Sequence, residues 1–206
     1  MYNSLRALVA PLLGLALLAG CEDGDGVIVP GEFSGTVRLD FAGDDRSGTF
    51  EATGEIDREG ESIAFGTWAA GSSDSRGTLV AGFRGESDPV GDLFLLTLVN
   101  VTEPGTYQIN TTSGDCDSAD PQNCNTAVLA FEVDVDALED GDVEGQAEAA
   151  YVLLSGEVTI DSASSEEERI TGSFSGTAAL ATDSSRTLTI TNGQFDVPLL
   201  LVPIVF

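Results

Sequence analysis

Hydrophobic and polar residues alternate with a period of two over most of the chain after Phe33. Phe33, Val37, Leu39 and Phe41 occupy one side of the first alternating segment, and small or charged residues occupy the other. Because successive side chains of a strand point to opposite faces, this pattern indicates strands buried on one face. Clusters of Gly, Ser, Asp and Pro separate the segments and predict turns, for example at residues 42–48 and 85–92.

The pattern predicts about ten strands and no amphipathic helix of useful length. The expected strands cover residues 33–41, 50–56, 63–68, 78–83, 93–101, 106–110, 125–135, 149–160, 170–181 and 187–197. The segment 93–101 is the most continuously apolar of these, so we expect a central strand buried on both faces. The fold class is therefore all-β: an antiparallel β-sandwich of about ten strands, with an up-and-down lipocalin-like barrel as the alternative.

The N-terminal segment has the layout of a secretory signal. Arg6 precedes an apolar run, residues 7–19, which is too short to cross a bilayer, since a spanning helix needs about 20 apolar residues. The run ends in Leu18, Ala19, Gly20 and Cys21, which resembles the lipobox of bacterial lipoproteins. That resemblance implies cleavage before Cys21, acyl chains such as palmitate on this cysteine, and lipid anchoring in the outer membrane, on its periplasmic or cell-surface side.

The sequence predicts three segments: a lipoprotein signal peptide (residues 1–20), an acidic tether (21–31) and a single antiparallel β domain (32–206). Removal of the signal leaves 186 residues, which is the length of one domain. A chain of this size can bury about 70% of its unfolded surface and needs no metal or disulfide to fold.

The second half of the chain contains several short motifs of strand and turn residues. They are Gly-Thr-Tyr at residues 105–107, Gly-Glu-Val-Thr-Ile at 156–160, Ile-Thr-Gly-Ser-Phe at 170–174 and Ile-Thr-Asn-Gly-Gln-Phe at 190–195. With these motifs the mature part resembles a family of small β-rich bacterial lipoproteins of unknown function. The resemblance implies an antiparallel β domain in the cell envelope, and it brings no catalytic residue with it.

The charge balance restricts the partners. Asp and Glu number 35 against 8 Arg, Lys is absent, and the formal net charge is −27. Because such a surface repels phosphate backbones, we expect no nucleic-acid partner. We expect the protein to contact the membrane through its N-terminal lipid. The sequence names no protein or glycan partner. Two explanations of the acidity stay open: general solvation, including adaptation to salt that screens the repulsion, and a surface that attracts cations.

The absence of His removes the usual general base, the Ser-His-Asp arrangement and imidazole metal ligands. We therefore expect a non-enzymatic binding or structural module of the cell envelope. One alternative is a lipocalin-like carrier that holds a small apolar ligand inside a barrel. A less favoured alternative is a glycoside hydrolase, because that chemistry needs only two carboxylates.

Cys116 and Cys124 lie in a polar, turn-forming segment. In the oxidising envelope compartment we expect them to form a disulfide, which stabilises so short a loop by roughly 2–3 kcal/mol.

Acidic residues after Phe131 are the candidate metal ligands: Asp134, Asp136, Asp140 and Asp142. Calcium takes six to eight oxygen ligands from loops of this kind, but the spacing does not match the twelve-residue calcium loop. The sequence therefore predicts no cofactor, with Ca²⁺ as the open possibility.

Overall fold

The computed structural model describes residues 34–43, 46–55, 62–68, 77–87, 90–99, 101, 103–111, 125–134, 147–164 and 168–199. Ten strands make up almost all of this part of the chain: β1 (Ser34–Gly43), β2 (Ser47–Glu55), β3 (Ser62–Trp68), β4 (Gly77–Ser87), β5 (Val90–Val99), β6 (Gly105–Asn110), β7 (Thr126–Asp134), β8 (Ala147–Ser164), β9 (Arg169–Leu180) and β10 (Asp183–Pro198). The predicted all-β fold is confirmed. The described residues contain no helix with the length and apolarity needed to span a membrane.

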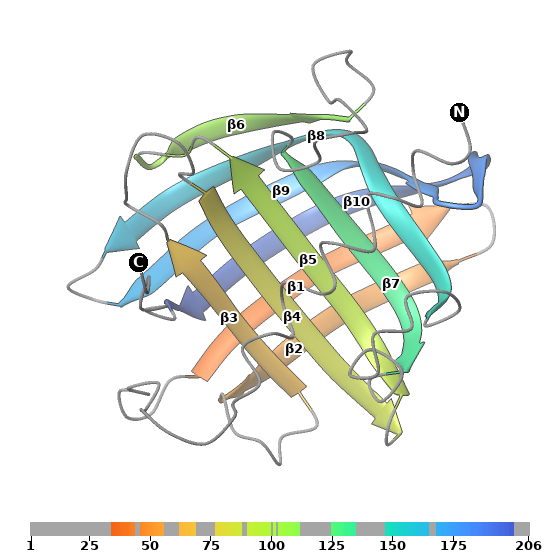
Figure 1. Cartoon of the computed structure of the whole chain (residues 1–206), viewed down its shortest axis with the longest axis horizontal. Helices are drawn as coiled ribbons and strands as arrows, with labels where there is room; N and C mark the ends of the chain where they lie inside the picture. The colour runs from red at the N-terminus through yellow and green to blue at the C-terminus, as the bar shows by residue number, and fades with distance from the viewer. Residues whose placement is uncertain are drawn as a thin grey trace, which may run out of the picture.

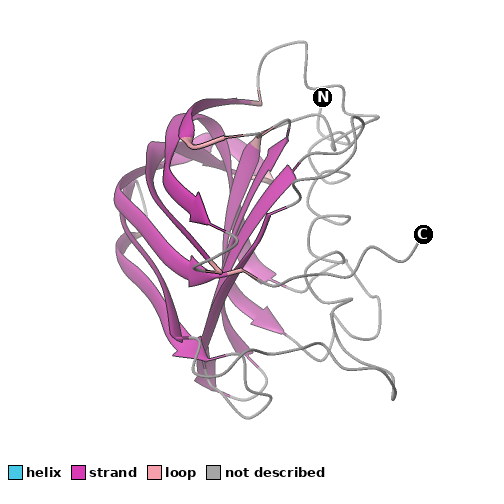
Figure 2. Cartoon of the chain, turned by 90° about the vertical axis from the view of Figure 1, so that its left-hand side faces the viewer, coloured by secondary structure: helices cyan, strands magenta, loops and turns pink. Residues whose placement is uncertain are grey.

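All ten strands belong to one antiparallel sheet. Its order is β2-β1-β10-β9-β8-β7-β5-β4-β3, and β6 pairs with β8. The 18-residue strand β8 pairs first with β7, through residues 147–152, and then with β6, through residues 155–160. Figure 1 shows β3, β4, β5 and β7 crossing in front of β1, β8, β9 and β10, and Figure 2 shows the strands from the side as one strongly curved sheet. The fold therefore has features of both expected architectures. It has two crossing layers, as in a sandwich, and these layers belong to a single, nearly closed sheet, as in a barrel.

The sheet closes where its edge strands β2 and β3 meet. The backbone N–H of Thr53 in β2 donates to the Ser62 Oγ in β3 at 3.0 Å. Gly54 is required here, because a Cβ at this position would lie 2.0 Å from the Ser62 carbonyl oxygen. After β10, Leu199 forms a parallel bridge with Gly66 of β3. Side-chain and single-bridge contacts therefore close the barrel in place of a full backbone ladder.

The interior of the barrel is filled by one hydrophobic cluster to which all ten strands contribute. Phe94 of β5 stacks on Phe174 of β9 with ring centroids 4.7 Å apart, so the two crossing layers are in direct contact. Full burial of a side chain of this size contributes about 1.5–3 kcal/mol, and this cluster is the main source of stability.

Strand β5 is buried on both faces, as the apolar run predicted. Phe94 and Leu96 belong to the interior cluster, whereas Leu93 and Leu95 belong to two smaller clusters on the outer face. The neighbours β4 and β7 pair with β5 on either side, which places it centrally in its layer.

Candidate functional site

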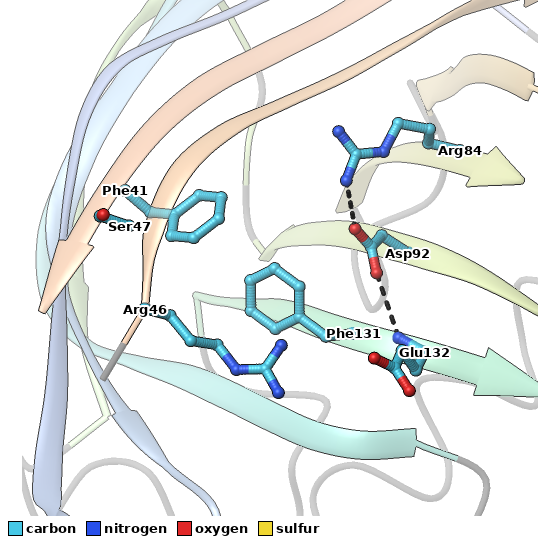
Figure 3. A pocket seen from close by; sticks show the side chains of 7 residues that line it. All are labelled: Phe41, Arg46, Ser47, Arg84, Asp92, Phe131 and Glu132. Carbon is cyan, nitrogen blue, oxygen red and sulfur yellow. Dashed lines mark hydrogen bonds and ion pairs between the residues drawn. The ribbon is translucent and has the colours of Figure 1, made fainter. Parts of the chain in front are cut away.

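A pocket of about 450 Å³ lies between strands β1, β2, β4, β5 and β7. Its lining residues are Phe41, Arg46, Ser47, Arg84, Asp92, Phe131 and Glu132 (Figure 3). Two of the eight arginines of this acidic chain therefore line one pocket. Asp92 is the single charged residue among the buried residues of the described strands.

The inner side of the pocket is built around Asp92. This carboxylate forms an ion pair with the Arg84 guanidinium through one oxygen, and its other oxygen accepts a hydrogen bond from the Glu132 backbone N–H at 3.1 Å. Arg84 also donates to the Thr49 carbonyl oxygen at 3.1 Å. The Asp92 side chain is 4% exposed and that of Arg84 is 31% exposed. Burial of the charge is tolerated because both carboxylate oxygens have partners.

A β-bulge places these groups together. Around Asp92 the β5–β7 ladder changes register, so that two residues of β7, Phe131 and Glu132, oppose this one residue of β5. Glu132 has φ of 52°, which lies in the left-handed region that costs a residue with a Cβ about 1 kcal/mol or more. The bulge leaves the Phe131 ring in the interior and the Glu132 side chain exposed. Local backbone strain of this kind is typical of sites with a binding role.

The rim of the pocket carries the second arginine. Arg46 donates to Glu148 Oε1 of β8 at 2.6 Å, and its guanidinium carbon lies 4.7 Å from the centroid of the Phe131 ring. That ring is in turn held 5.1 Å from Phe41 and 6.1 Å from Tyr151, centroid to centroid. The Arg46 side chain is 25% exposed and that of Glu148 is 54% exposed. The guanidinium carbon therefore lies over an aromatic ring, while the glutamate partner of Arg46 is solvent-exposed.

A second hollow, of about 440 Å³, lies on the outer face of β1, β2, β8, β9 and β10. Its ion pair joins Arg38 and Glu51 at 3.8 Å, and both side chains are about half exposed. Because the Arg38–Glu51 pair is solvated and Asp92 is the one buried charge among the described residues, the pocket around Asp92 is the stronger candidate site.

Asp40, also on β1, has a pKa below its usual value. The Asn192 amide donates to one of its oxygens at 2.9 Å and the Thr49 hydroxyl donates to the other at 2.7 Å. These two hydrogen bonds favour the ionised form and lower the pKa, with the Asn192 contact making the larger contribution. The carboxylate links three adjacent strands, β2, β1 and β10, so its perturbation has a structural cause.

Most residues that the sequence singled out lie outside the described part of the chain. These are the lipobox residues Leu18, Ala19, Gly20 and Cys21, the cysteines Cys116 and Cys124, and the calcium candidates Asp136, Asp140 and Asp142. Asp134 is described and ends β7, where it lies opposite Val90 of β5. Within the described ranges no three Asp, Glu, His or Cys residues are grouped so that they could hold a metal ion.

Sequence reasoning missed the pocket, because it placed Arg46 and Asp92 in turns. One signal was available: Asp92 directly precedes the most apolar of the predicted strands. A carboxylate that enters a strand buried on both faces needs a cationic partner, and arginine is the sole type of basic residue in this chain.

No protein-family model, curated protein or solved structure matches this chain. A functional assignment therefore has to come from the residues of this chain. Guanidinium groups, a ring wall and an oriented carboxylate together can bind a small polar ligand through charge-assisted hydrogen bonds.

Proposed function

We propose that the protein is a lipid-anchored, non-enzymatic binding module of the cell envelope, and that the pocket around Asp92 is its binding site. The anchoring is inferred from the lipobox-like residues Leu18 to Cys21 at the end of a short apolar segment. Two or three acyl chains hold a protein on a membrane stably, whereas one chain binds marginally.

The pocket supports a binding role. Its volume of about 450 Å³ lies in the range of small-molecule sites, and it combines two aromatic rings with a few convergent polar groups. Both oxygens of Asp92 are engaged by Arg84 and the Glu132 N–H, so this carboxylate orients the site and is poorly suited to exchanging protons with a substrate. The absence of His from the chain supports the same non-enzymatic assignment.

The filled interior favours this assignment over a carrier. A lipocalin-like carrier holds its ligand inside the barrel, where the described strands place one continuous cluster of side chains. The pocket around Asp92 is instead lined mostly by polar and charged side chains. Two of these side chains, Glu132 and Ser47, are exposed.

The anchoring is tested by labelling cells with an alkyne analogue of palmitate and comparing wild type with Cys21→Ser. We expect label and membrane association in the wild type and loss of both in Cys21→Ser. The double variant Cys116→Ser/Cys124→Ser is the control and should keep the label. An unmodified Cys21 thiol in the wild-type protein, detected by mass spectrometry, would disprove the anchoring. Protease treatment of whole cells then distinguishes the cell-surface side from the periplasmic side.

A further inference from the structure

The geometry of the pocket points to a ligand class: we infer that Arg46 binds the carboxylate group of a small organic ligand, and that Glu148 occupies the place of this carboxylate as an internal stand-in. This inference rests on the proposed function and names the ligand of that same site. It follows from the contacts of Arg46, the exposure of Glu148 and the burial of Asp92.

Arg46 is held ready to bind. The Gly43 N–H donates to the Arg46 carbonyl oxygen at 2.9 Å and closes the β1–β2 turn, which fixes the backbone at this residue. The guanidinium carbon lies 4.7 Å from the Phe131 ring centroid, so the ring limits the movement of the guanidinium. An oriented guanidinium loses less conformational freedom on binding a carboxylate, and its parallel N–H groups match the two carboxylate oxygens.

Glu148 is the partner that can be replaced. Its side chain is 54% exposed, whereas the Asp92 side chain across the pocket is 4% exposed. A solvated glutamate regains its hydration when it leaves Arg46, so displacement costs little. Asp92 is different, because its departure from Arg84 would leave a partly buried guanidinium and the Glu132 N–H without this acceptor.

Two aromatic rings lie beside the Arg46 guanidinium. Phe41 and Phe131 line the pocket with their rings 5.1 Å apart, next to the Arg46 guanidinium. Both rings are buried, with Phe41 9% and Phe131 4% exposed, so the rings support the guanidinium and the carboxylate group is what Arg46 recognises.

Phenylacetate is a suitable probe, and 2-phenylethanol is its neutral match. Isothermal titration would use the full lipid-anchored protein in a non-ionic detergent at pH 7. We expect saturable binding of phenylacetate, and binding of 2-phenylethanol weaker by about tenfold or more, because the alcohol cannot form the charged pair.

Three variants assign the binding to Arg46. Arg46→Gln should weaken phenylacetate binding about tenfold or more, and Glu148→Gln should tighten it several-fold because the internal competitor is lost. Arg38→Gln removes a comparable exposed ion pair from the outer hollow and should leave binding unchanged. Equal affinity of wild type and Arg46→Gln, equal affinity for the acid and the alcohol, or no saturable binding to either wild type or Glu148→Gln would overturn the inference. Labelling of Cys21 would be unaffected by these results, so failure of the anchoring and failure of the ligand class are distinguishable.

Discussion

Two arginine–carboxylate pairs face the same pocket, and their surroundings differ. On the inner side Arg84 pairs with a carboxylate that is almost fully buried, and on the rim Arg46 pairs with one that is about half exposed. Both guanidiniums lie near an aromatic ring, Phe50 for Arg84 and Phe131 for Arg46. Because the two pairs have the same chemistry, we expect burial of the acidic partner to decide how strongly each pair stabilises the fold.

The largest effect is expected at the inner pair. Asp92→Ala removes the acceptor of both Arg84 and the Glu132 N–H, so we expect the free energy of unfolding to fall by about 3–5 kcal/mol. Urea unfolding followed by circular dichroism measures it. Glu51→Ala, which breaks an exposed pair on the outer face, is the control and should cost at most about 1 kcal/mol. A loss at Asp92 no larger than that at Glu51 would show that burial does not separate the pairs.

The next largest effect is expected at the β-bulge of β7, where Glu132 has its left-handed backbone conformation. Glu132→Gly relieves the left-handed backbone conformation, and we expect a gain in stability of up to about 1 kcal/mol. Glu168 has nearly the same φ, 51°, so Glu168→Gly should also gain. Glu157, in the middle of β8, is the contrasting position, where glycine should cost about 0.5–1 kcal/mol. Destabilisation by Glu132→Gly comparable to that of Glu157→Gly would show that the bulge stores no strain.

A smaller effect is expected at the rim. Glu148→Gln keeps the shape of the side chain and removes its charge, and we expect the free energy of unfolding to change by less than about 1 kcal/mol. The same urea titration used for Asp92→Ala provides the comparison. If the loss instead approached that of Asp92→Ala, Glu148 would be a structural residue and could not yield its place to a ligand.

The smallest effect concerns an exposed carboxylate outside the pocket. The lowered pKa of Asp40 means that its hydrogen bonds stabilise the fold above the ordinary carboxyl pKa of 3.8, and that this contribution disappears as the pH falls through the lowered folded-state value. Wild type should therefore exceed Asp40→Asn in stability at pH 7 by more than it does at pH 2. A difference that is independent of pH across this interval would contradict the hydrogen-bonded origin of the shift.

The sequence predicted the strands correctly wherever one or both faces of a strand are buried. The alternation in β1 predicted its inward residues Val37, Leu39 and Phe41, all of which are buried, and the apolar run predicted the central position of β5. Strand ends were less accurate. Strand β8 extends to Ser164, beyond the predicted end at Ile160, because a register shift between Ile160 and Ser162 lets its pairing with β9 continue.

The pocket around Asp92 could not be predicted from the sequence, because its contacts join distant parts of the chain. Asp92 and Glu132 meet because β5 pairs with β7 and not with β6, which follows it in sequence. Arg46 and Glu148 are 102 residues apart. Local patterns assign each residue to a strand or turn, but they contain no information on which strands become neighbours.

The incomplete seam between β2 and β3 has a dynamic consequence for the rim. Each of these strands has a continuous ladder on one side, to β1 and β4 respectively, while the seam itself depends on contacts such as the Thr53–Ser62 hydrogen bond. Amide hydrogens along the seam should exchange fastest with deuterium. Since Arg46 directly precedes β2, separation of the seam would carry this guanidinium away from the Phe131 ring. The hydrogen bond from Arg84 to Thr49 of β2 would break too, while the contacts of Asp92 with Arg84 and the Glu132 N–H, all on β4, β5 and β7, would persist.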